Sequence, residues 1–306
     1  MFLGIEIGGT KLQLALGDGS ATLFEKRKLA VDAALGAEGI RRQIERTLPE
    51  LLRGRVVAGA GLGFGGPVDW RAGKIACSHQ IEGWSGFDLG GWLKGQIGVP
   101  VSVDNDANLG ALGEATHGAG VGHDPVFYVT LGSGVGGGLV WGGRIYHGAA
   151  PGESELGHVR LDRGGATVES RCSGWAVDAR IRALNARAPQ TAMAALCRRD
   201  PGGEARHLNA ALAQGDASAR QLLEEVAADL AFGLSHVTHL VHPQLIVLGG
   251  GLSGVGEPLR AAVEASLRGG IMEVFQPGPK IALARLGEDA VPVGALFLAS
   301  KAHPIA

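Results

Sequence analysis

Short apolar segments alternate with segments of helical periodicity along most of the chain. Short continuous apolar runs predict buried strands, which we expect at residues 2–7, 12–16, 56–64, 99–103, 126–131, 139–141, 245–248 and 281–286. Apolar residues three and four positions apart predict helices at 37–53, 86–97, 107–115, 221–241, 257–266 and 293–300, and over most of 172–240. This alternation of strands and helices indicates an α/β fold.

One arrangement occurs near the start of each half of the chain: a strand, a glycine-rich turn and a second strand. The turns are 8–11 and 132–138, and the second has five glycines in seven residues. Successive backbone N–H groups without intruding side chains bind phosphate oxygens, so the repeat predicts a polyphosphate site. A third run, 249–251, lies between a strand and a helix, where open α/β sheets bind ligands, although such a turn alone is more often structural. The residues of the first two turns that are expected to contact the phosphate-bearing ligand are Gly8, Gly9, Thr10, Lys11, Thr130, Gly132, Ser133 and Gly134, and Gly249, Gly250 and Gly251 form the third run.

Residues 104–106, with the sequence Asp-Asn-Asp, stand where a predicted strand ends and a helix begins. A carboxylate at such a point can accept the proton of an attacking hydroxyl group, and Asp106 is our first choice for this general base. Asp104 competes for the role on sequence alone. The other interpretation is that these residues only cap the helix, which Asp and Asn commonly do.

Glu155, His158 and Glu169 form a second group of polar residues, after the second glycine turn. A few placed polar groups are typical of sites for small polar ligands, whereas the alternative here is a solvated loop. We expect no zinc site at His158, because structural zinc takes four ligands that are usually rich in cysteine. No cysteine lies between His158 and Glu169, and Cys172 alone is insufficient.

The composition narrows the class of protein. A length of 306 residues indicates two domains, because single hydrophobic cores stop growing near this size. The formal charge of −2 and the lack of a basic stripe argue against binding to nucleic acid or to an anionic membrane. Three cysteines, a start without signal-peptide features and the lack of a long apolar stretch predict a cytoplasmic protein. The spacings of the Walker A loop and of the dinucleotide-binding glycine motif are both missing.

Taken in order, these motifs resemble those of the ROK family, which is named after repressors, open reading frames and sugar kinases. The resemblance covers essentially the whole chain. Residues 4–11 (Gly-Ile-Glu-Ile-Gly-Gly-Thr-Lys) and 130–138 resemble its two phosphate loops, and 103–108 (Val-Asp-Asn-Asp-Ala-Asn) resembles its catalytic segment. The remaining similar segments are 61–69 with 82–84 on the sugar side, the signature at 148–158, and the adenosine-side segment at 243–253.

The resemblance implies the two-lobed actin-like ATPase fold, also called ribonuclease H-like, with the active site in the cleft between the lobes. The expected domains are an N-terminal α/β lobe of residues 1–105, with a C-terminal helix at 290–306 packed on it, and a larger α/β lobe of residues 106–289. The implied reaction is ATP-dependent phosphorylation of a hexose at its 6-hydroxyl. Glucose is the first choice, with fructose, mannose and the N-acetyl amino sugars as alternatives, and a homodimer is what the family implies.

The same resemblance assigns roles to individual residues. Asp106 is implied to be the catalytic base, and ATP is implied to lie on the three glycine turns with Mg²⁺ on its phosphates. The residues implied to bind the sugar are Gly66, Asn105, Asp106, Glu155, His158 and Glu169.

Three positions depart from the family pattern. Glu6 stands where an Asp is usual, which leaves its longer side chain an indirect contact with Mg²⁺. The segment 158–169 is too short for the cysteine-rich zinc loop of many relatives, so we expect a member without zinc. His79-Gln80 stands where relatives often have Pro-Asn, and that Asn can contact the sugar, so the choice of sugar is expected to differ.

Two other functions are considered. The departures motivate a non-catalytic sugar sensor on the same fold, but Asp106 weighs against it, because a sensor needs no base. A sugar-responsive repressor is not expected, because the first phosphate loop begins at Gly4 and leaves no room for a helix-turn-helix domain.

Overall fold

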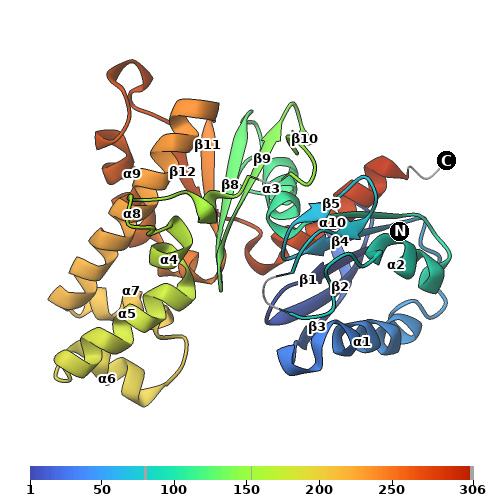
Figure 1. The fold of residues 1–306 in the computed structure, drawn as a ribbon, viewed down its shortest axis with the longest axis horizontal. Helices are drawn as coiled ribbons and strands as arrows, with labels where there is room; N and C mark the ends of the chain where they lie inside the picture. Colours follow the sequence, from blue (N-terminus) through green and yellow to red (C-terminus); the bar gives the residue numbers. More distant parts are fainter. Residues whose placement is uncertain (79–80, 153, 304–306) are drawn as a thin grey trace. The chain divides into compact units, whose positions relative to one another are not determined.

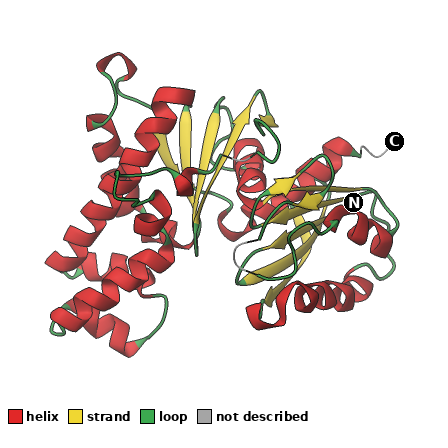
Figure 2. Ribbon diagram, viewed as in Figure 1, coloured by secondary structure: helices red, strands yellow, loops and turns green. Residues whose placement is uncertain are grey.

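The chain is divided between two structural units, in which strands and helices alternate as the sequence predicts (Figures 1 and 2). The first unit contains Met1–Gly122, Gly138–Ser154 and Glu288–Ala306, and the second contains His123–Gly137 and Glu155–Gly287. The computed structural model describes residues 1–78, 81–152 and 154–303. The predicted departure at His79-Gln80 and residue 153 of the signature therefore lie outside the described residues. The lobe boundaries after residues 105 and 289 stay a prediction.

The first unit is built on a five-stranded sheet with the order β3-β2-β1-β4-β7. The strands β1 (Phe2–Ile7), β2 (Lys11–Gly17) and β3 (Leu23–Ala30) are antiparallel, whereas β4 (Ala60–Phe64) and β7 (Val101–Asn105) extend the sheet in parallel. β1 and β4 are buried along their whole length, and such strands read as continuous apolar runs. The predicted hairpin of two strands around the glycine turn 8–11 is confirmed.

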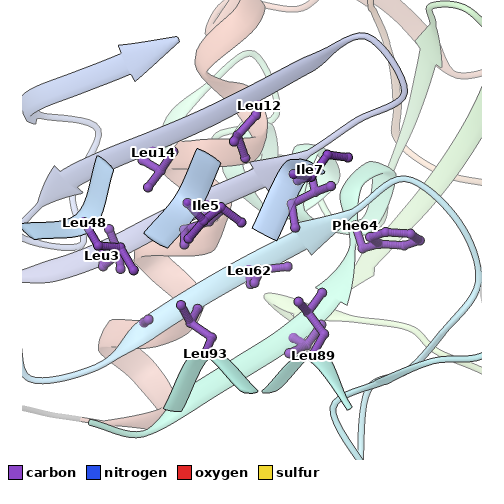
Figure 3. Close-up of a cluster of buried hydrophobic side chains, with 14 of the residues drawn as sticks. Leu3, Ile5, Ile7, Leu12, Leu14, Leu48, Leu62, Phe64, Leu89 and Leu93 are labelled. Atoms are coloured by element: carbon purple, nitrogen blue, oxygen red, sulfur yellow. The ribbon is translucent and has the colours of Figure 1, made fainter. Parts of the chain in front are cut away.

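A hydrophobic core packs this sheet against the helices α1 (Gly36–Leu51) and α2 (Leu89–Ile97). Figure 3 shows side chains of β1, β2 and β4 gathered with Leu48 of α1 and with Leu89 and Leu93 of α2. Full burial of one such side chain contributes about 1.5–3 kcal/mol. The core therefore holds in place the strands whose ends carry the first glycine turn.

Helices α3 (Asp106–His117) and α10 (Ala290–Ala302) pack against each other, and α10 also contacts β1 and β4. The backbones approach so closely that no side chain fits at several contact points. A Cβ atom at Gly61 would lie 2.0 Å from the carbonyl oxygen of Ala295, and one at Gly294 would lie 1.9 Å from that of Leu109. Part of the high glycine content therefore serves packing rather than ligand binding.

The second unit contains a parallel sheet in which β11 (Leu245–Gly249) lies between β8 (Val126–Leu131) and β12 (Lys280–Leu283). Its longest helix, α8 (Ala217–Val241), packs against α9 (Glu257–Gly269) and α4. The other helices of this unit are α4 (Val168–Cys172), α5 (Gly174–Arg187), α6 (Ala192–Arg199) and α7 (Leu208–Ala213). The same sheet continues beyond β8 with β9 (Val135–Trp141) and β10 (Arg144–Ile145), whereas β5 (Val68–Asp69) and β6 (Lys74–Ile75) pair with each other.

The structure corrects several predicted boundaries. β9 begins at Val135, inside the glycine run for which the sequence predicts a turn up to residue 138. Gly138 lies within this strand, and a Cβ atom there would lie 2.5 Å from the carbonyl oxygen of Ala107, so the close approach to α3 requires glycine. The strand predicted at 56–64 begins only at Ala60, and the strand predicted at 281–286 ends at Leu283.

No helix in the described part of the chain combines the length and the apolar character that crossing a membrane requires.

Candidate active site

The first glycine turn lines a small pocket in the first unit. The N–H group of Gly8 donates to the carbonyl oxygen of Lys11 over 2.9 Å, which closes the turn between β1 and β2. The N–H group of Gly65, just after β4, donates to the carbonyl oxygen of Ile7 over 2.9 Å. Gly8, Gly9 and Gly65 therefore line the same pocket, together with Phe64 and Ser78. Glycine backbone on both sides of a pocket is suited to binding oxygen-rich ligands.

Glu6 lies near the end of β1, just before this turn, and is 4% exposed. One of its carboxylate oxygens lies 3.0 Å from Lys11 Nζ, and the other accepts a hydrogen bond of 2.6 Å from Gln13 Nε2. The same amide nitrogen of Gln13 donates to the carbonyl oxygen of Glu288 over 2.9 Å. Because both oxygens of Glu6 already have partners, its predicted indirect contact with Mg²⁺ is compatible with this arrangement, and direct coordination is not needed.

Asn105 joins two predicted site segments in the first unit. Its Oδ1 accepts hydrogen bonds from the N–H groups of Ala107 (2.8 Å) and Asn108 (3.2 Å), so that it caps α3. Its Nδ2 donates to the carbonyl oxygen of Gly66 over 3.1 Å. The structure therefore brings Gly66 and Asn105 together, and it shows that the capping interpretation holds for Asn105.

Asp106 is the first residue of α3 and lies next to the glycine segment after β4. One of its oxygens accepts a hydrogen bond of 2.8 Å from the N–H group of Ala107. A Cβ atom at Gly65 would lie 3.2 Å from the other oxygen and 3.6 Å from the Cα atom of Gly8. Gly65 is thus the point at which the Asp106 carboxylate and the first glycine turn approach each other. A helix N-terminus also stabilises negative charge, both on a carboxylate and on a phosphate.

Asp104, the alternative base, has a different environment. It is 2% exposed, and its Oδ1 accepts hydrogen bonds from the N–H group of Asn105 (2.8 Å) and from Asn108 Nδ2 (3.0 Å). Its Oδ2 lies 2.8 Å from His147 Nε2. A buried carboxylate with partners on both oxygens is poorly placed to take a proton from a ligand, which favours Asp106 as the base.

The second glycine turn is closed by short backbone bonds in the second unit. The N–H group of Gly132 donates to the carbonyl oxygen of Gly134 over 2.9 Å, and that of Gly174 donates to the carbonyl oxygen of Gly132 over 2.7 Å. Glu169 Oε2 accepts a hydrogen bond of 2.9 Å from the N–H group of Val135. A Cβ atom at Gly134 would lie 2.4 Å from that carboxylate oxygen, so a larger residue there would push the Glu169 carboxylate away. Glu169, which the sequence predicts only as a sugar-binding residue, therefore also anchors the second glycine turn.

The third glycine run meets the second in space. Gly249 is paired in register with Thr130, and Gly250 has a φ of +79°, a conformation that favours glycine. A Cβ atom at Gly250 would lie 2.5 Å from the backbone nitrogen of Leu131. The structure thus brings together two of the three segments that the sequence predicts to bind the phosphate-bearing ligand.

Glu155 and His158 flank a short 3-10 turn, in which the N–H group of His158 donates to the carbonyl oxygen of Glu155 over 3.1 Å. Both side chains are exposed. A Cβ atom at Gly157 would lie 2.2 Å from the carbonyl oxygen of Val135 and 3.5 Å from Glu169 Cβ. The three predicted sugar-binding residues of this unit therefore belong to segments that meet at the start of β9.

The predicted site residues form two groups, one in each unit. The first group is Glu6, Gly8, Gly9, Thr10, Lys11, Gly66, Asn105 and Asp106, and the second is Thr130, Gly132, Ser133, Gly134, Glu155, His158, Glu169, Gly249, Gly250 and Gly251. Within residues 1–78, 81–152 and 154–303, no three His, Cys, Asp or Glu side chains cluster in a way that could hold a metal ion.

Two residues of the first unit were missed by reasoning from the sequence. Gln13 is fully buried in the apolar strand Leu-Gln-Leu, and that single polar position was an available signal. His147 contacts Asp104 across 43 residues of sequence, and no local pattern marks it.

A family model and two known proteins each match nearly the whole of this chain. The sequence model described as the ROK family matches residues 2–302. The glucokinase of Streptomyces coelicolor is 31% identical over 318 aligned positions, which cover 99% of this chain and 98% of that protein. The bifunctional enzyme NanE/NanK of Brucella melitensis is 34% identical over 306 positions, which cover 97% of this chain and 54% of that protein.

A solved structure supports the same assignment. The ROK family glucokinase from Streptomyces griseus, crystallised with glucose and AMPPNP, superimposes with a TM-score of 0.87 at 31% identity and covers 98% of this chain and 99% of its own. This likeness confirms the predicted fold class, the α/β actin-like ATPase fold. The chain belongs to the ROK family.

Proposed function

We propose that this protein is a sugar kinase that transfers the γ-phosphoryl group of ATP to the 6-hydroxyl of a hexose, with glucose as the first sugar to test. One observation carries the proposal. Gly65 lies beside both the Asp106 carboxylate and the backbone of Gly8, so a candidate base and a candidate phosphate turn approach each other at one glycine. The similarity to glucokinases of about 30% identity over the whole chain supports the same activity.

The chemistry requires one base and a set of hydrogen-bond donors. Asp106 accepts the proton of the sugar hydroxyl while the hydroxyl oxygen forms its bond to the γ-phosphorus. The bond from the γ-phosphorus to the bridging oxygen breaks, and ADP leaves. The N-terminus of α3 stabilises the negative charge that gathers next to Asp106. Catalysis of this kind depends mostly on positioning and on electrostatic stabilisation.

The glycine turns of each unit would supply backbone donors to the nucleotide, and bound Mg²⁺ would neutralise charge on its phosphates. The N–H groups of Gly8 and Gly132 close the first two turns, and the neighbouring backbone N–H groups of Gly9 and Gly134 suit phosphate oxygens. Thr10, Lys11, Thr130 and Ser133 lie beside them, and Gly249, Gly250 and Gly251 lie toward the adenosine. Glu6, whose two oxygens contact Lys11 and Gln13, would contribute to the metal indirectly.

The sugar is held by Gly66, Asn105 and Asp106 in the first unit, and by Glu155, His158 and Glu169 in the second. Glu169 uses one oxygen for the turn, which leaves the other for a sugar hydroxyl. Fructose, mannose and an N-acetyl amino sugar are the alternative substrates, and the identity of 34% with NanE/NanK makes the amino sugars worth early testing.

The proposal includes a cytoplasmic homodimer that needs no zinc. Chelation followed by addition of Mg²⁺ alone should then restore full activity, and a requirement for added zinc would contradict this part.

The experiment is ADP release with ATP and Mg²⁺ across a panel of hexoses and amino sugars, with a control lacking sugar. Asp106→Asn should retain sugar affinity and lose at least about 10²-fold in kcat. Asp88→Asn, which changes a carboxylate at the N-terminus of α2, is the matched control and should keep its kcat. Turnover of Asp106→Asn near the wild-type rate would remove Asp106 from the mechanism. Sugar binding without ADP release by the folded wild type would favour the sensor.

A further inference from the structure

One imidazole in the first unit lies between a buried acid and an aromatic ring. His147 Nε2 lies 2.8 Å from Asp104 Oδ2, so that the ring N–H donates to the carboxylate. The His147 ring is stacked on Trp70, with 4.2 Å between ring centroids and an interplanar angle of 16°. The side chain of Asp104 is 3% exposed and that of His147 is 17% exposed. A hydrogen bond and a stacking contact therefore fix this ring from two sides.

The three residues come from segments that serve the proposed site. Trp70 follows β5 and the sugar-side glycines, and Asp104 directly precedes Asn105 and Asp106. Asp104 also holds the N–H group of Asn105 and the side chain of Asn108 through its other oxygen. His147 lies in the segment 146–152, whose continuation along the chain carries Glu155 and His158.

Loss of the imidazole would leave a buried carboxylate oxygen without its donor, which is costly for a charged group. Asp104 would then shift or take up water, and the backbone at Asn105 would follow, because Asp104 holds its N–H group. The segment 146–152 would lose its attachment to the start of α3 at the same time.

We propose that His147 is a positioning residue for sugar binding and phosphoryl transfer. It holds the segment 146–152 against the segment that carries Asp106. This contact fixes the point from which the chain continues toward Glu155. This inference rests on the proposed function, because sugar binding is what the positioning serves. His147 acts through Asp104 and not by touching the substrate.

Two variants of His147 separate the hydrogen bond from the stacking contact. His147→Phe keeps an aromatic ring against Trp70 and removes the donor, whereas His147→Gln keeps an amide donor and removes the ring. We expect His147→Phe to raise the KM for the sugar by about tenfold or more and to leave the KM for ATP within about twofold, since misplaced binding groups cost rate and affinity. His147→Gln should recover most of the loss. Tyr146→Phe, at a neighbouring side chain that is 53% exposed, is the matched control and should behave as wild type.

Two further readouts do not depend on turnover. Calorimetry with glucose should show the same loss of affinity in His147→Phe and its recovery in His147→Gln. Hydrogen exchange of the amides in 104–108 and 146–152 should be faster in His147→Phe than in the wild type or in His147→Gln. A wild type that binds glucose without ADP release would overturn the proposed function and still allow these tests of His147.

The proposal is overturned by three results. The first is a His147→Phe variant with wild-type sugar affinity and wild-type exchange. The second is an equal loss in His147→Phe and His147→Gln, which would mean that the hydrogen bond to Asp104 is not what matters. The third is a His147→Phe variant with unchanged KM values for sugar and ATP and an apparent kcat that falls in proportion to the fraction of unfolded protein, which would indicate a purely structural role.

Discussion

The ammonium group of Lys11 lies 3.0 Å from the buried carboxylate of Glu6, directly after the first glycine turn. The side chain of Glu6 is 5% exposed, whereas that of Lys11 is 30% exposed. The pair therefore joins a buried charge on β1 to a partly exposed charge at the start of β2. Gln13 donates a hydrogen bond to the other oxygen of the same carboxylate. A buried carboxylate with these partners depends on them more than an exposed one does.

Lys11→Met should lower the free energy of unfolding by about 1–3 kcal/mol, because it leaves the Glu6 carboxylate buried without its cation. Urea unfolding of the purified variant measures this difference. Arg42→Met on α1 is the matched control, since Arg42 pairs with Glu38 at the surface and both side chains are 63% exposed. The control should change stability by less than about 1 kcal/mol. Equal effects in the two variants would contradict the role given to burial.

Gly65→Ala should lower kcat by roughly tenfold, because the new Cβ atom would press on the Asp106 carboxylate and move it from its position. The contact distance would be 3.2 Å, which the flexible carboxylate can relieve only by shifting. Steady-state kinetics and thermal unfolding together check this, with a small change in Tm expected.

Gly95→Ala in α2 provides the control for the same chemical change. A Cβ atom at Gly95 would meet nothing within 4 Å among the residues that the structure describes. This variant should keep its kcat and gain about 0.4–1 kcal/mol of stability, because glycine is unfavourable inside a helix. An undiminished kcat in Gly65→Ala would show that Asp106 is not constrained by its glycine neighbour.

Glu169 is expected to show two separable roles. Glu169→Ala removes the acceptor of the Val135 N–H group. The KM for ATP should rise several-fold, which is about the effect of losing one partly buried hydrogen bond. Glu169→Gln keeps a carbonyl acceptor for that N–H group, so the KM for ATP should stay near wild type while the KM for the sugar rises. A KM for ATP that is unchanged in both variants would limit Glu169 to sugar binding.

Cys172 should be unreactive in the folded protein. Burial raises the pKa of its thiol from 9.0 to about 12, and the thiolate is the reactive form. In the double variant Cys77→Ser/Cys197→Ser, a thiol reagent at pH 8 should label nothing until urea is added. The raised pKa of this thiol also makes the stability of the protein depend on pH. The unfolded chain loses this proton from about pH 9 upward while the folded chain keeps it, so this thiol lowers stability as the pH rises toward 12.

Apolar runs were enough to predict most strands of the two sheets. The ranges 2–7 and 126–131 coincide with β1 and β8, because strands buried on both faces leave a continuous apolar signal. β3 was missed, since Leu23–Ala30 is largely polar and lies at a sheet edge. Its Lys28 pairs with Glu288, at the far end of the chain, and no local pattern can indicate such a partner.

The site residues that lie in a local motif could be predicted from the sequence. Contacts between residues far apart in the chain could not. The segment of Asp104, Asn105 and Asp106 was placed correctly at a strand end, but sequence alone could not rank the two acids. Their ranking came from burial and from His147, whose contact with Asp104 depends on the fold. The glycines of 132–138 were assigned to ligand binding as a group, whereas Gly138 serves the close approach of β9 to α3.

The place of α10 in the first unit has a consequence during protein synthesis. This helix packs against β1, β4 and α3, yet it follows the whole second unit along the chain. The apolar surfaces of β1 and β4 that α10 covers are made early, and they stay uncovered on the ribosome until residues 290–302 emerge. The nascent chain must therefore carry an incomplete first unit throughout translation of the second, and chaperones that bind exposed apolar strands have that interval in which to act.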